Sequence, residues 1–177
     1  VKLDKDDNKA FGPGPLVILY QVPPGIDNEE ILDMIEDGAP RATQPPQKVQ
    51  LARLDNSNLP HPDITALMDS TLESALETLV TSPPDALTSE PLIGSANLLK
   101  PPTPVLFFSG FSNPEMMAVY NIMGPEIYQE SGGQVTPACA KAVPNAMSKP
   151  LRQVLDEICG DHEDAMRMVQ EEDDDDS

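Results

Sequence analysis

Few residues of this sequence have the types and spacing that catalysis requires. The chain contains two histidines, His61 and His162, which are far apart in the sequence. A serine nucleophile needs a neighbouring base and a sharp turn, and the Gly-x-Ser-x-Gly pattern of such a turn is missing around Ser109. We therefore predict no catalytic residues and expect that this protein is not an enzyme.

Ser109 and Gly110 nevertheless occupy a position at which ligands are often bound. They follow the apolar run 105–108, and open α/β sheets bind ligands beyond the carboxyl ends of their strands. Gly25 follows the apolar run 16–20 in the same way. One interpretation is a ligand-binding site formed by these three residues, and the favoured alternative at Ser109 is a tight structural turn.

The sequence indicates no metal or cofactor site. Residues 161–164 are acidic around His162, but they are chain neighbours rather than residues on one helix face. The run 173–176 lacks the glycine and the spacing of a calcium loop. Residues 61–63 match the His-Pro-Asp tripeptide of co-chaperone J-domains, but no basic helix precedes them, so the start of a helix is favoured. Phosphate-binding glycine motifs are absent, and we predict no cofactor.

Two isolated cysteines, Cys139 and Cys159, do not form a disulfide framework. This usage indicates a reducing compartment, and we expect both thiols to be buried or merely tolerated. A single redox disulfide between them is the less favoured alternative.

The charge of the chain limits its partners. Its formal net charge is −19, from 30 acidic and 11 basic residues. Nucleic-acid backbones and anionic membrane surfaces attract clustered lysine and arginine, so neither is expected as a partner. No run approaches the ~18 apolar residues of a membrane span, and we predict no direct membrane insertion. The acidity favours either solubility alone or a basic protein partner.

An internal repeat predicts the fold class. The apolar run 16–20 is followed by a helical pattern at 28–35, and the apolar run 105–108 by a similar pattern at 113–120. Each run follows a proline and precedes a loop that contains glycine. We therefore predict an α/β protein with two related strand–helix–strand–helix halves joined by proline-rich extended connections. Strands within a half should pair in parallel, and the halves could share one sheet or form two lobes.

The pattern also predicts element and domain boundaries. We expect further strands at 48–54 and 141–143, one long helix at 63–80, a helix from 113 to about Met123, and a last helix that starts near Pro150 and could extend past Gly160. The predicted organisation is an extended arm (1–15), a first half (16–80), a Pro/Ser-rich linker (81–103), a second half (104–170) and a solvated acidic tail (171–177).

The helix that begins at residue 113 is rich in soft side chains. Met116, Met117, Tyr120 and Met123 recur at helical spacing. Methionine-rich surfaces adapt to partners, so these residues are candidates for partner binding. A position in the hydrophobic core is the favoured alternative for such a stripe.

The last third of the chain resembles a small bacterial and plastid α/β domain family of unknown function. The resemblance lies in Val-Leu-Phe-Phe-Ser-Gly-Phe at 105–111, Lys-Ala-Val-Pro-Asn at 141–145, and the helix 150–158 with His162 after it. The Pro/Ala-containing insert at 136–142 departs from the family pattern. The resemblance implies an α/β fold and no particular activity. It also implies the plastid stroma as the location, with photosynthetic complexes as candidate hosts and the cytoplasm as the alternative.

These observations favour a non-catalytic accessory or assembly subunit that docks on a larger protein complex or a basic protein surface. The 20 prolines predict extended segments, which gain affinity from contact area although they add little to a core. The alternative is a small-molecule-binding regulatory module with its ligand at the strand ends.

Overall fold

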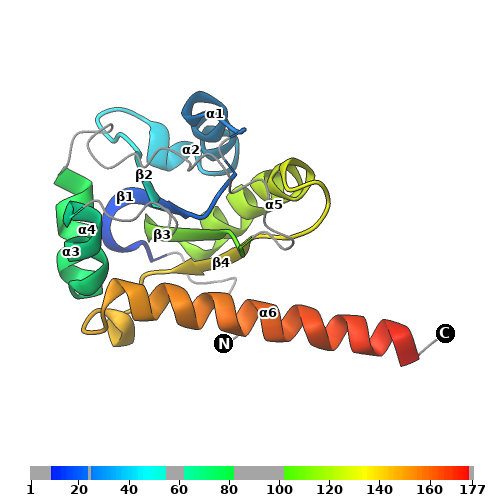
Figure 1. Ribbon diagram of the computed structural model, residues 1–177. Coiled ribbons are helices and arrows are strands. Elements are labelled where there is room, and N and C mark those ends of the chain that lie inside the picture. The colour runs from blue at the N-terminus through cyan, green and yellow to red at the C-terminus, as the bar shows by residue number, and fades with distance from the viewer. Residues whose placement is uncertain (1–8, 24, 55–61, 82–101, 176–177) are drawn as a thin grey trace.

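A mixed four-stranded sheet lies between two layers of helices (Figure 1). The computed structural model describes residues 9–23, 25–54, 62–81 and 102–175. The strands are β1 Phe11–Tyr20, β2 Gln50–Leu54, β3 Val105–Phe111 and β4 Ala138–Lys141. The helices are α1 Asn28–Gly38, α2 Pro40–Thr43, α3 Pro62–Asp69, α4 Leu72–Thr81, α5 Asn113–Glu130, the 3₁₀ turn η2 Pro144–Ala146, and α6 Leu151–Asp175.

The strand order shows that both halves share one sheet. The order is β2-β1-β3-β4, with β1 parallel to β2 and β3 parallel to β4. The two halves meet where β1 pairs antiparallel with β3, so that Leu16 lies opposite Ser109 and Tyr20 opposite Val105. In this strand order, the two halves of the sheet are related by an approximate twofold axis perpendicular to the sheet. The predicted α/β fold with two related halves is confirmed.

Each face of the sheet has its own hydrophobic core because side chains alternate along the strands. Helices α1, α2 and α5 cover the face that carries Val17 and Phe108. Helices α3, α4 and α6 cover the opposite face, which carries Ile18 and Phe107. The central strands therefore contribute to both cores, which explains their continuous apolar runs.

The first strand is longer than expected. It begins at Phe11 and therefore includes the Gly/Pro segment 12–15, which we expected to belong to the extended arm and not to the first half. A register shift between Phe11 and Leu16 accommodates this segment against β3. Such bulges allow a strand to continue through residues that cannot maintain regular pairing.

The single helix predicted at 63–80 is two helices, α3 and α4. At the break, Leu72 N donates to Lys149 O (2.8 Å) and Leu151 N donates to Ser70 O (2.9 Å). These bonds to the segment before α6 replace the bonds of a continuous helix. Apolar spacing could not reveal the break because α3 and α4 both bury their apolar residues in the same core.

Two helices extend beyond their predicted ends. Helix α5 continues through Pro125 to Glu130 because Met123 and Ile127, on either side of the proline, are both buried in one core. Packing of this kind outweighs the loss of a single backbone hydrogen bond. Helix α6 continues past Gly160, as its apolar stripe predicted. It ends at Asp175, so most of the segment expected to be a solvated acidic tail is helical.

Other expectations differ in position or lie outside the described residues. Strand β4 occupies Ala138–Lys141 and overlaps the predicted strand at 141–143 in one residue. His61 and residues 82–101 of the predicted linker lie outside the described residues.

Candidate functional site

Ser109 and Gly110 form a closed junction with the start of β1. The Ser109 hydroxyl donates a 2.6 Å hydrogen bond to the carbonyl of Pro13, and the residue is 1% exposed. A Cβ atom placed on Gly12 would collide with the Ser109 hydroxyl, and one on Gly14 would collide with the Ser109 carbonyl. The chain itself therefore fills the space around the hydroxyl, which indicates a structural role for Ser109. The predicted tight turn is wrong, because Ser109 and Gly110 lie inside strand β3 and Ser109 pairs with Leu16.

Gly25 lies at the other edge of the sheet. It approaches the carboxylate of Glu130, the last residue of α5, whereas Gly110 precedes the first turn of that helix. An 18-residue helix is about 27 Å long. Because β1 and β3 are antiparallel, their carboxyl ends point to opposite edges, so Gly25 and the Ser109–Gly110 pair do not form one ligand site.

Only part of the methionine stripe of α5 is accessible. Met116 and Met123 are fully buried in the core between α5 and the sheet. The Tyr120 hydroxyl donates a 2.8 Å hydrogen bond to Pro137 O, and burial raises the pKa of Tyr120. Met117 is half-buried. The prediction of partner binding is therefore wrong for Met116 and Met123, because these side chains face the sheet.

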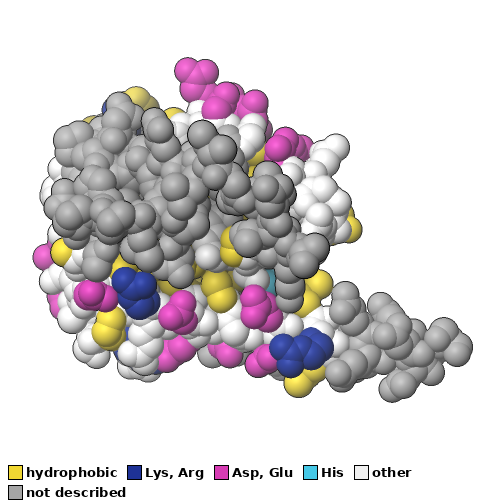
Figure 2. Space-filling model, in the orientation of Figure 1, with side chains coloured by type: hydrophobic (Ala, Val, Ile, Leu, Met, Phe, Trp, Pro, Cys, Tyr) yellow, Lys and Arg dark blue, Asp and Glu magenta, His cyan; other side chains and the backbone are white. Residues whose placement is uncertain are grey.

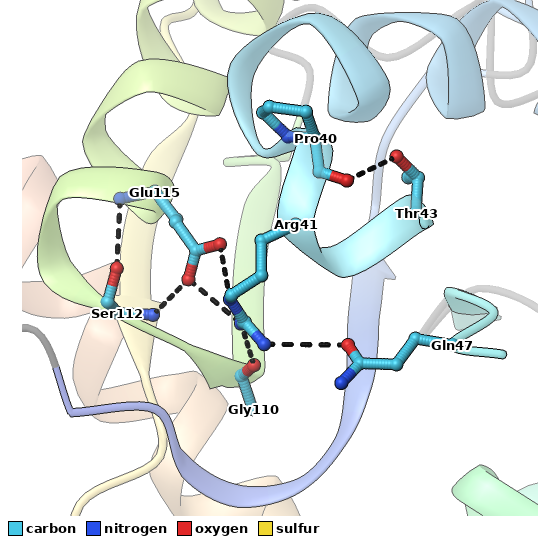
Figure 3. Close-up of polar contacts among 7 residues, drawn as sticks. All are labelled: Pro40, Arg41, Thr43, Gln47, Gly110, Ser112 and Glu115. Atoms are coloured by element: carbon cyan, nitrogen blue, oxygen red, sulfur yellow. Dashed lines mark hydrogen bonds and ion pairs between the residues drawn. The ribbon is translucent and has the colours of Figure 1, made fainter. Parts of the chain in front are cut away.

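An ion pair between α2 and α5 was not foreseen from the sequence (Figure 3). Arg41 donates from Nε to Glu115 Oε2 (2.8 Å) and from Nη2 to Glu115 Oε1 (2.9 Å). Arg41 Nη2 also donates to the carbonyl of Gly110 (3.1 Å), so the guanidinium joins α2 to the end of β3. Glu115 completes a capping box with Ser112, a Ser-x-x-Glu signal that was readable in the sequence although its partner Arg41 was not.

The ion pair changes the charge properties of both residues. Burial alone would raise the pKa of Glu115, but the hydrogen bonds from Arg41 and Ser112 outweigh it and leave this pKa below its ordinary value. The bond to Glu115 raises the pKa of Arg41. The guanidinium is thus neutralised by a partner in its own chain, which indicates a fastening between elements rather than an anion-binding group.

A second arginine stabilises the opposite edge of the sheet. Arg53 donates from Nε to Asn28 Oδ1 (2.8 Å) and from Nη2 to the carbonyl of Ile26. Desolvation lowers the pKa of this half-buried guanidinium. Arg53 therefore holds the loop that leads into α1, and its charge is also used within the fold.

The two thiols are on opposite faces of the sheet. Cys139 packs in the core beneath α5, and Cys159 packs in the core beneath α6. Both are free, and burial raises the pKa of Cys139 to about 12 and that of Cys159 to about 11. A redox disulfide between them is not compatible with this arrangement.

His162 fastens α6 rather than forming part of a metal cluster. Its Nε2 lies 3.0 Å from the carbonyl and 3.1 Å from the hydroxyl of Thr136, so the imidazole holds α6 to the residues just before β4. Glu163, the next residue, accepts a 2.8 Å hydrogen bond from the Thr103 hydroxyl. Within the described ranges, no group of three His, Cys, Asp or Glu side chains could hold a metal ion.

The last part of α6 extends away from the sheet, and we call residues 164–175 the α6 arm (Figure 1). Leu151 and Leu155 near the start of α6 are fully buried. On the arm, Met166, Met168 and Val169 are 40%, 65% and 51% exposed. Figure 2 shows acidic side chains along the layer formed by α6, with hydrophobic side chains between them. In the part of the chain that the structure describes, no helix is both long and apolar enough to cross a bilayer.

No protein-family model, curated protein or solved structure matches this chain. Its function must therefore be inferred from its own residues. Single apolar side chains are also exposed on the body of the protein, at Phe11, Leu32, Tyr128 and Val143, whereas the α6 arm carries three exposed apolar side chains within four residues, Met166, Met168 and Val169. The predicted strand-end positions are occupied by the chain itself.

Proposed function

We propose that this protein is a non-catalytic accessory or assembly subunit that docks on a larger protein complex through the α6 arm. The observation that carries the proposal is the exposure of Met166 and Val169 on a helix that leaves the body of the protein. Exposed apolar side chains on a projecting element are a common mark of a protein–protein contact. The arm is a rigid helix at its base because His162 and Glu163 fasten α6 to the residues beside the sheet.

The chemistry of the described residues supports a binding role over catalysis. The Ser109 hydroxyl is engaged by Pro13, and the Arg41 guanidinium is paired with Glu115. The pKa values of both cysteines are raised, so neither thiol forms a reactive thiolate near neutral pH. Covalent catalysis needs a nucleophile with a base beside it, and none of these four residues is placed in such a pair.

The charge of the chain supports a partner with a basic surface. A net charge of −19 accelerates encounter with a positively charged protein and opposes contact with acidic ones. A location in the plastid stroma, with a photosynthetic complex as the host, rests only on the family resemblance of the last third. The cytoplasm is the alternative location.

Affinity purification of the tagged chain from its native source, followed by mass spectrometry, tests the proposal. We expect one partner to be enriched over background under gentle, low-salt conditions, with Met166→Ser reducing its recovery and Met168→Ser leaving it unchanged. Recovery of a lone chain under gentle, low-salt conditions would contradict the accessory-subunit function.

A further inference from the structure

The apolar stripe of the α6 arm continues the stripe that anchors the first half of α6. Residues at alternating steps of four and three share one side of the helix, because 3.6 residues form a turn. In the anchored half this side is buried against the sheet. In the arm the same side is exposed, so the stripe has no cover from the described residues beyond Glu163. The stripe consists of Leu151, Leu155, Ile158, His162, Ala165 and Val169, with Met166 beside it.

Acidic residues flank the exposed part of the stripe. Asp161, Glu163 and Asp164 precede the exposed apolar residues, and every residue from 171 to 175 is acidic. Arg167 is the basic residue of the arm, and it is paired with Asp164 at 3.4 Å. The segment 161–175 is therefore strongly acidic in sequence, and the whole chain has a net charge of −19, which disfavours a second copy of this chain as the occupant.

We propose that the occupant of the stripe is a short amphipathic helix of a partner protein, with lysine or arginine on both sides of its apolar face. This inference rests on the proposed docking function and specifies the chemistry of the partner. Leucine or isoleucine at heptad spacing would pack on Met166 and Val169, and Ala165 would allow the helices to approach closely. The basic side chains would pair with the acidic ones that flank the stripe, as e and g positions do in coiled coils.

The length of the arm sets the strength of the contact. The 12 residues of the arm form a little over three turns, a length of about 18 Å. A contact of this length falls in the class of small interfaces, below about 1,200 Å² of total buried area, which are weak and transient. The pairing should also be sensitive to salt, because exposed charges are screened over about 10 Å at 0.1 M ionic strength.

Two synthetic peptides serve as probes for the full-length protein. The first is an 18-residue helix with leucine at a and d and lysine at e and g, and the second has glutamate in place of lysine. We expect fluorescence anisotropy to detect micromolar binding of the lysine peptide, with at least about tenfold weaker binding of the glutamate peptide. We also expect at least about tenfold weaker binding of the lysine peptide when the salt concentration is raised from 0.05 to 0.5 M.

Matched serine variants separate the stripe from general charge attraction. Met166 and Met168 are two residues apart, so their side chains point to nearly opposite sides of the helix. Both changes lower helix propensity equally and leave the charge unchanged. Met166→Ser should weaken binding of the lysine peptide about fivefold or more, by loss of buried apolar area, and Met168→Ser should leave it within twofold. Equal binding by the two variants would overturn the proposal, because charge alone would then explain the attraction.

Two further measurements decide between occupants and between the two proposals. If the chain alone forms a dimer in sedimentation that Met166→Ser disrupts, the occupant is a second copy and the proposal is wrong. If native purification yields a complex that Met166→Ser does not weaken, this inference and docking through the α6 arm are both wrong, and only the accessory function stands. If the lysine peptide binds in a Met166-dependent way but the native chain is recovered alone, the inference stands and the accessory function is wrong.

Discussion

Arg41 in α2 and Glu115 in the first turn of α5 form a double-pronged ion pair, with N–O distances of 2.8 and 2.9 Å. The Glu115 side chain is only 15% exposed, and it also accepts a hydrogen bond from the backbone N–H of Ser112. Two elements that are 74 residues apart in the sequence are thereby fixed to one another.

Glu115→Gln should lower the free energy of unfolding by about 1–2 kcal/mol at pH 7, because a hydrogen-bonded and partly buried charge pair is lost. The pKa of Glu115 is lowered in the folded state, so its contribution is present above the ordinary glutamate pKa of about 4.3 and is lost as the pH falls through the folded value. Urea unfolding at pH 7 and at pH 3 measures both effects. A stability difference between the two proteins that stays constant over this range would contradict the assignment.

Gly14→Ala and Gly160→Ala should have opposite effects on stability. Gly14 has a φ of +149°, and an added Cβ would collide with the backbone of Ser109, so we expect a loss of about 3 kcal/mol. At Gly160, inside α6, an added Cβ would meet no atom within 4 Å, so alanine should stabilise the helix by about 0.5–1 kcal/mol. Chemical denaturation of both variants checks the signs. A destabilising Gly160→Ala would mean that the middle of α6 is not a regular exposed helix.

Both cysteines should be slow to react in the folded protein. Their pKa values of about 12 for Cys139 and about 11 for Cys159 leave little thiolate at pH 8, mainly because the thiols are buried. We expect alkylation by iodoacetamide at pH 8 to be at least about a hundredfold slower than that of an ordinary thiol with a pKa near 8.5, and slower for Cys139 than for Cys159. Rapid alkylation after addition of denaturant is the control. Mild oxidation should leave the monomer without an internal disulfide.

Hydrogen exchange should divide α6 into two parts. Amides near Leu151 and Leu155 lie in a buried segment and should exchange slowly, whereas those of the α6 arm should exchange faster because few contacts oppose local opening. Mass spectrometry of peptides from α6 would measure the difference. Uniform protection along the helix would indicate that the arm is covered in the free protein. Addition of the lysine peptide described above should slow exchange in the arm alone.

The repeat was sufficient to predict the fold class because the pattern of strand and helix is local and occurs twice. Sequence patterns could not decide whether the halves share one sheet, since both arrangements bury the same apolar runs. The pairing of Leu16 with Ser109 and of Tyr20 with Val105 is a long-range choice that no local signal contains. For the same reason the break between α3 and α4, which is stabilised by Lys149 and Leu151, could not be predicted.

The candidate site was less predictable than the fold. Gly25 and Ser109 resembled ligand-binding residues because each follows an apolar run in the sequence. The antiparallel pairing of β1 with β3 places them at opposite edges of the sheet. The soft residues of α5 satisfied a pattern that core and surface share, and only burial separated Met116 from an accessible side chain. The apolar residues in the last part of α6 were visible in the sequence. That this part of the helix extends beyond the sheet could not be predicted, because it depends on where the sheet ends.

The antiparallel pairing of β1 with β3 bears on how many partners one chain could bind. A pair of identical subunits joined by such a pairing would display every surface feature twice, once on each side of the axis. Here the two halves belong to one chain, and their last described helices differ in length: α4 has 10 residues and α6 has 25. Among the described elements, the twofold core thus carries a single arm, so docking through this arm, as proposed, would attach one partner to each chain and would not bridge two partners.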